Sequence, residues 1–166
     1  MNIGRFISIG GILTTIAVLF QSAPIFLPTV GMALSPLSTL PIAISAYLNM
    51  SLGISVLISS ALILIFISIE ETLILLFTTG LLGLILGLLY RRKLIISILG
   101  TAITLSIGMV ILTYIIGISA FGDFTESLSL SVTLIIFVAF SIIYATIWNL
   151  CLKRFIQYLI KIKVLI

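Results

Sequence analysis

Residues 70–93 read EETLILLFTTGLLGLILGLLYRRK, an apolar run with two acidic residues before it and three basic residues after it. An α-helix needs about 20 apolar residues to cross the roughly 30 Å hydrocarbon core of a bilayer. Short loops that carry Lys and Arg stay in the cytoplasm. The stretch therefore predicts a membrane span at 72–89 that starts outside the cell and ends in the cytoplasm.

The same separation of charge extends to the whole sequence when its apolar runs are interpreted as six spans. The predicted spans are 6–23, 37–48, 51–67, 72–89, 94–118 and 128–152. All eight basic residues then face the cytoplasm, and all four acidic residues face outward. The basic residues are Arg5, Arg91, Arg92, Lys93, Lys153, Arg154, Lys161 and Lys163, and the acidic ones are Glu70, Glu71, Asp123 and Glu126. We expect an all-α polytopic membrane bundle, a single domain over 1–166 with both termini cytoplasmic.

The second span, 37–48, is short for a membrane crossing. At about 1.5 Å per residue it covers only part of the hydrocarbon core. It either extends backward through Met32 or forms a re-entrant piece buried against other helices. Fusing it with 51–67 would exceed the bilayer thickness and would move the Arg91 cluster to the side opposite Arg5. Six spans, or four with a re-entrant hairpin, satisfy the charge rule, and length favours six.

Composition excludes several classes of function. The chain is 62% hydrophobic and 7% charged, whereas soluble domains carry about 25% charged residues, so its partner is the lipid bilayer. Its basic residues form small groups at span ends, not a stripe with interleaved aromatic residues, which argues against nucleic-acid binding. With no His and only Cys151, the usual metal and haem ligands are missing. We expect no cofactor, no metal and no enzymatic activity, because no His or Lys lies near a Ser or Thr to activate it.

Small residues recur at helical spacing in three of the predicted spans. The stripes are Gly4, Ser8, Gly11 and Thr15; Gly80, Gly83 and Gly87; and Gly100, Thr104 and Gly108. Such stripes let helix backbones approach closely in lipid. Packing inside one bundle is their common use. The other use is docking onto a second membrane subunit, for which Gly11 and Thr15 in the first span are the best candidates.

Three segments carry a resemblance to a known family. They are residues 40–44 (LPIAI), 49–53 (NMSLG) and 83–92 (GLILGLLYRR). With the size, the six spans and the small-residue stripe of the first helix, the chain resembles the substrate-binding S-component of energy-coupling-factor vitamin transporters. In that family an Ala-x-x-x-Ala pair in the first helix docks onto a transmembrane coupling subunit. Gly11 and Thr15 occupy the matching stretch here and keep the small size without the identity.

The resemblance implies a multi-pass protein of a bacterial cell membrane that captures a small molecule, such as a vitamin or a cation, for an ATP-driven partner. The residues expected to contact it lie in the outer half: Gln21, Glu71, Tyr114 and Asp123, beneath a connection at 24–36. Structural roles compete with this interpretation, because acidic residues cap helices and Tyr anchors at membrane boundaries. Five residues are expected to cluster at the inner boundary, where Trp and Tyr act first as anchors and second as a partner surface: Tyr47, Asn49, Tyr90, Trp148 and Asn149.

Two classes of function remain open. One is the substrate-capturing subunit, which requires a partner because the sequence contains no phosphate-binding P-loop. The other is a non-transporting scaffold, an assembly or regulatory subunit whose stripes pack against another protein. Capture predicts an outward cavity with convergent polar groups, whereas a scaffold predicts a filled bundle.

The predicted orientation is tested with Arg92→Cys and Asp123→Cys, each in a Cys151→Ser background. An impermeant thiol reagent applied outside intact cells should label the second variant and spare the first, because short basic loops remain in the cytoplasm. Labelling is read by mass shift, with permeabilised cells as the control. Preferential labelling at position 92 would contradict the predicted topology.

Overall fold

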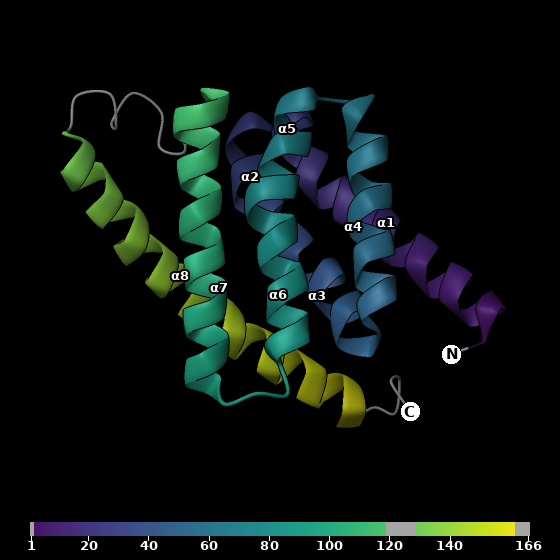
Figure 1. Ribbon diagram of the computed structural model, residues 1–166. Helices are drawn as coiled ribbons and strands as arrows, with labels where there is room; N and C mark the ends of the chain where they lie inside the picture. Colours follow the sequence, from purple (N-terminus) through teal and green to yellow (C-terminus); the bar gives the residue numbers. More distant parts are fainter. Residues whose placement is uncertain (1, 119–128, 162–166) are drawn as a thin grey trace.

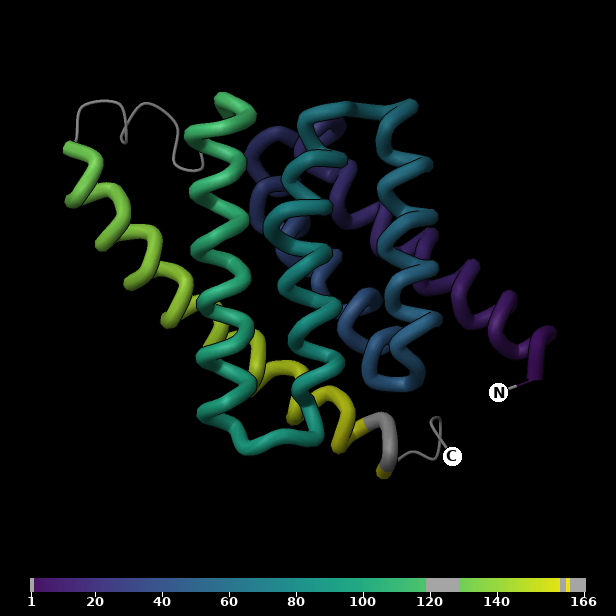
Figure 2. Tube along the Cα trace, in the orientation of Figure 1, coloured from purple at the N-terminus to yellow at the C-terminus, as the bar shows by residue number. Residues whose placement is uncertain are grey.

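The computed structural model describes residues 2–118 and 129–161, and every regular element in them is a helix. Helices α4, α6 and α7 stand side by side, while α1 and α8 cross them obliquely (Figures 1 and 2). The elements are α1 (Ile3–Phe26), α2 (Pro28–Leu34), the 3₁₀ segment η1 (Ser35–Ser38), α3 (Thr39–Leu48), α4 (Met50–Ile65), α5 (Ile69–Ile74), the π-helical segment η2 (Leu75–Thr79), α6 (Gly80–Leu89), α7 (Leu94–Val110), the π-helical segment η3 (Ile111–Ile116) and α8 (Leu130–Lys161). The all-α prediction is confirmed for the described residues.

Five helical segments are long and apolar enough to cross a membrane. They are Ile3–Phe26, Pro28–Leu48, Ile69–Leu89, Leu94–Ile116 and Leu130–Tyr158. Helix α4 is also apolar, but it has 16 residues and extends only about 24 Å at 1.5 Å per residue. The fold is consistent with a multi-pass membrane protein.

The connection between the first two spans is mostly helical, so the prediction of a loop at 24–36 is wrong. Helix α1 continues through Pro24, and α2 begins at Pro28. Proline suits the first position of a helix because the backbone N–H there has no intrahelical partner. A Cβ at Gly31 would overlap the carbonyl oxygen of Ala23, so this glycine permits the tight reversal between α1 and α2.

Two predicted span limits need correction. The second span, predicted at 37–48, starts at Pro28 and has 21 residues, which is about 31 Å of helix. The last span, predicted to end at residue 152, continues as helix to Lys161. It continues because Leu152 and Ile156, one helical turn apart, both remain buried against the bundle.

Helix α3 lies between two clusters of buried side chains. Ile42 packs in a cluster with α1 and α4, and the adjacent Ala43 packs in a cluster with α6, α7 and α8; both are fully buried. Gly83 and Gly87 of α6 make this position possible. A Cβ at either glycine would crowd the carbonyl oxygen of Thr39 or of Ala43. Close backbone approach of this kind is what holds helices together in lipid.

A buried polar contact joins α7 to α8. The Oδ1 atom of Asn149 accepts a hydrogen bond from the Ser97 hydroxyl at 2.5 Å, and its Nδ2 donates to the Thr101 hydroxyl at 3.1 Å. Asn149 is 4% exposed and Trp148 is 7% exposed. Both residues therefore fasten α8 inside the bundle, a role that the sequence analysis did not predict.

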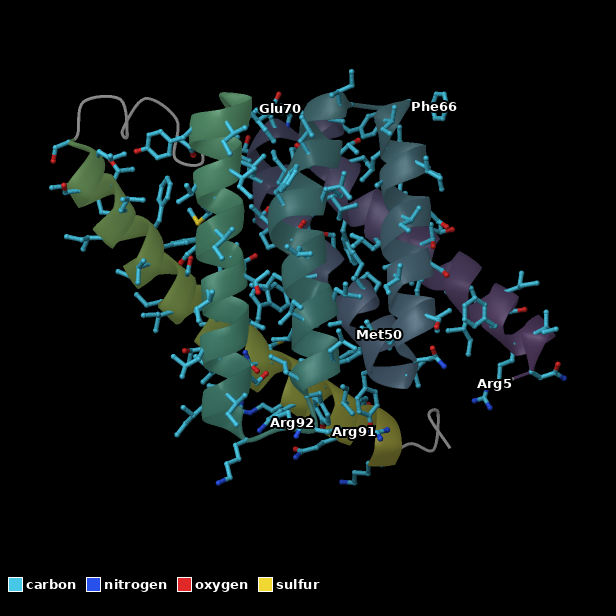
Figure 3. All side chains as sticks on the ribbon, in the orientation of Figure 1. Arg5, Met50, Phe66, Glu70, Arg91 and Arg92 are labelled. Carbon is cyan, nitrogen blue, oxygen red and sulfur yellow. The ribbon has the colours of Figure 1, made fainter. Side chains whose placement is uncertain are left out.

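The charged residues labelled in Figure 3 lie at opposite ends of the bundle. Arg5, Arg91 and Arg92 lie at one end, here called the basic end, and Glu70 lies at the other, here called the acidic end (Figure 3). At the basic end the Arg91 guanidinium lies 5.7 Å from the centroid of the Tyr47 ring, a distance that allows a cation–π contact. Three charged residues whose side of the membrane was predicted lie outside the described residues: Asp123, Glu126 and Lys163.

We predict that Gly87→Ala lowers the melting temperature of the purified protein, whereas Gly11→Ala does not. The added methyl at position 87 would overlap α3, and overpacking typically costs about 1–3 kcal/mol. At Gly11 no atom lies within 4 Å of the position that a Cβ would take. Thermal unfolding of both variants in one detergent, followed by circular dichroism, measures the difference. Equal melting temperatures would contradict the packing of α6 on α3.

Candidate functional site

A cavity of about 390 Å³ opens at the acidic end. Its wall comes from segments far apart in the sequence, including η1, α5, η2, α7 and α8. The polar wall residues are Ser35, Glu70, Glu71, Thr78, Thr79 and Tyr144. The apolar wall residues are Pro24, Met32, Pro36, Ile74, Leu105, Met109, Leu112, Ile118 and Phe140. An apolar wall with a few convergent polar groups is the usual character of a small-molecule site.

Gln21 supports the cavity wall from α1. Its Nε2 donates to Glu71 Oε2 at 2.8 Å, and its Oε1 accepts from the hydroxyls of Ser38 at 2.7 Å and Thr79 at 2.9 Å. The side chain is fully buried, with both ends of the amide occupied. Gln21 therefore positions Glu71 and Thr79, which face the cavity, and is not itself a wall residue.

Glu71 stands in the first turn of α5, where the Ser68 hydroxyl caps the helix by accepting from the Glu71 N–H at 3.3 Å. Its carboxylate is partly buried, while the adjacent Glu70 is exposed. Oε2 of Glu71 is occupied by Gln21, whereas Oε1 has no hydrogen-bond partner among the described residues. The wall thus contains one carboxylate held in place and a second at the mouth.

Two π-helical segments border the cavity. Thr78 and Thr79 belong to η2, and Leu112 belongs to η3. A π-helical turn holds one more residue than an α-turn, and such turns occur often at functional sites. Beside η2, a Cβ at Gly108 of α7 would overlap the carbonyl oxygen of Phe77. The close approach of α7 to η2 therefore depends on that glycine.

Helix α8 brings aromatic rings to the cavity that the sequence analysis missed. The Phe140 and Tyr144 rings are stacked, with centroids 5.4 Å apart, and both line the wall. Trp148 continues the series one turn further, 6.0 Å from Tyr144 between centroids. The spacing of four residues in the sequence is the signal that could have shown a shared helix face. Only the fold shows which face meets the cavity.

The structure brings together two of the four residues predicted to contact a ligand. Gln21 and Glu71 are hydrogen-bonded to each other. Tyr114 is 47% exposed and is not part of the cavity wall. Asp123 lies outside the described residues. Of the four residues predicted to contact a ligand, Glu71 is thus the one placed in the wall.

The predicted docking pair lies on an open face of α1. Gly4 and Gly11 have no atom within 4 Å of a built Cβ, unlike Gly53, Gly83, Gly87 and Gly108, which contact neighbouring segments. The Thr15 hydroxyl donates to the Gly11 carbonyl oxygen at 3.0 Å, so it stays on its own helix. A shallow groove runs along this face beside Ser8. Gly4 and Gly11 are therefore not covered by other segments of the described chain.

Comparison of the chain with protein-family models, with curated proteins and with solved structures found no match. Within the described residues, no three His, Cys, Asp or Glu side chains gather to hold a metal ion. Fold and site together define a class: an all-helical bundle of multi-pass membrane type with a mostly apolar cavity at its acidic end.

We predict that Gln21→Leu destabilises the protein by about 1–3 kcal/mol, the usual cost of leaving buried polar groups without partners. The variant keeps a similar size but leaves the buried hydroxyls of Ser38 and Thr79 without their acceptor. Thermal unfolding in detergent measures the loss. Gln157→Leu is the matched control, because Gln157 is exposed on α8. If the two variants unfold alike, the network does not hold the helices together.

Proposed function

We propose that this protein is the substrate-capturing transmembrane subunit of an energy-coupling-factor type transporter. ATP hydrolysis drives such a transporter to take up a small molecule. The observation that carries the proposal is the cavity of about 390 Å³ at the acidic end. Small-molecule sites in proteins commonly measure about 300–1,000 Å³. A bundle that served only as a scaffold has no need of such a space between its helices.

In the proposed orientation the acidic end faces outward and the basic end faces the cytoplasm of a bacterial cell. Helix α4 adds a sixth span to the five longer helical segments and is the third in chain order. It crosses between Asn49 at the basic end and Ser68, before α5, at the acidic end. The position of Arg5, Arg91 and Arg92 at the basic end supports this orientation. The cavity then opens toward the side from which a nutrient arrives.

Uptake by this chain requires a partner. Its 166 residues contain no P-loop, which would bind the phosphates of ATP. The open stripe of α1 supports docking of a coupling subunit through Gly11 and Thr15, because small residues let a second helix approach closely in lipid. The ATPases belong to that partner complex.

The second candidate function, a scaffold or regulatory subunit, is favoured by the same open stripe, because a docking face serves either role. The two candidates differ in the partner and in the cavity. Capture requires a partner complex that hydrolyses ATP and a small molecule that comes with the purified chain. A scaffold requires neither. Mild purification from native membranes, with mass spectrometry of bound proteins and small molecules, separates them.

We predict that the double variant Gly11→Leu, Thr15→Leu loses its copurifying coupling subunit and keeps its own melting temperature. The leucines block close approach at two exposed positions of α1, and no atom lies within 4 Å of a Cβ built at Gly11. Gly11→Ala, Thr15→Ala is the matched control, because alanine keeps the surface small and should retain the partner. Retention of the partner by the leucine variant would exclude this face as the interface, and a partner without ATPases would favour the scaffold.

A further inference from the structure

The cavity at the acidic end contains negative charge without a compensating positive group. Among the described residues of its wall, Glu70 and Glu71 are the charged ones, and the rest are uncharged. The labelled arginines of the bundle lie at the opposite end (Figure 3). No Lys or Arg of the described chain therefore lines the site to pair with either carboxylate.

The environment of Glu71 makes the absence of a positive partner energetically unfavourable. The carboxylate is partly removed from water, and its one side-chain hydrogen bond comes from the neutral amide of Gln21. Burying a charge without an opposite charge is unfavourable, and the cost falls when a cation arrives. Since Oε1 has no partner in the described part of the chain, it is free to accept a hydrogen bond from a ligand that donates one.

The rest of the wall suits an apolar body and not a hydrated ion. Leu105, Met109 and Leu112 supply aliphatic surface, and Phe140 and Tyr144 supply two stacked rings. The electron-rich faces of such rings attract ammonium groups. A calcium ion would need about six to eight oxygen ligands. The described residues bring no three carboxylate, His or Cys side chains together for a metal.

We infer that the cavity binds a small organic cation, with a protonated amine at Glu71 and an apolar body against α7 and α8. This inference rests on the proposed function and adds the chemical class of the substrate. Glu70, exposed at the mouth, raises the local concentration of cations without a fixed contact. Anions are repelled by the same pair of carboxylates. Neutral analogues lose the attraction between opposite charges at Glu71.

The test uses three probes with one skeleton and different head groups: 3-phenylpropylammonium, 3-phenylpropanol and 3-phenylpropionate. Binding to the full chain in phosphatidylcholine nanodiscs is measured by calorimetry, with empty nanodiscs to subtract partition into lipid. We expect the ammonium to bind about tenfold or more tightly than the alcohol, and the carboxylate to bind most weakly. Equal affinity of ammonium and alcohol, or no binding of the ammonium, overturns the inference.

Glu71→Gln tests the assigned contact. The variant keeps an oxygen that accepts from Gln21 and loses the charge, so it should fold with an unchanged melting temperature. We expect it to bind the ammonium and the alcohol with similar affinity. Glu70→Gln is the matched control one residue away and should reduce the preference by less than about threefold, because its exposed carboxylate acts at longer range through water. A full preference for the ammonium in Glu71→Gln would contradict the assignment.

These outcomes are separate from those that test the proposed function. If the alcohol or the carboxylate binds as well as the ammonium, the cavity still captures small molecules, and only the charge preference is lost. If no ATP-hydrolysing complex copurifies with the chain, the transporter role fails, whatever the probes show.

Discussion

The close contact between α3 and α6 is the interaction on which the rest of the structure depends. Gly83 and Gly87 bring the α6 backbone against the carbonyl groups of α3. In lipid the helices gain little from hydrophobic burial, so association rests on such packing. The contact fixes α3 at the centre, where Ile42 and Ala43 join the two buried clusters. Helices α1 and α4 pack on one side of it, and α7 and α8 pack on the other.

The cavity lies where this close packing gives way toward the acidic end. There the chain changes from α-helix to the 3₁₀ segment η1 and the π-helical segments η2 and η3. There the Gln21 side chain bonds to groups from η1, α5 and η2. A buried network in which both ends of an amide are satisfied is rigid. It can therefore hold Glu71 at an open space without closing that space.

The small-residue stripes show two uses of one sequence pattern. In α6 and α7 the glycines are covered by other parts of the chain, while in α1 Gly4 and Gly11 face outward. Spacing alone does not separate these uses, because both need a small side chain every third or fourth residue. The difference follows from the oblique position of α1, whose outer face no described segment covers (Figure 1).

The sequence by itself determined the helical class and the grouping of the described charges at two ends, because hydropathy and charge are properties of single residues and short segments. It did not determine how far the helices extend. The stretch from Pro24 to Pro36 suggested a loop, but Pro24 lies inside α1 and α2 begins at Pro28. Helix α8 extends further than expected because Leu152 and Ile156 pack against a buried surface. Tertiary structure alone decided that Gln21 meets Glu71, which is 50 residues away in the sequence, and that Phe140 and Tyr144 face the same cavity. Those contacts depend on the angles at which helices pack, and side-chain shape summed over the whole bundle sets the angles.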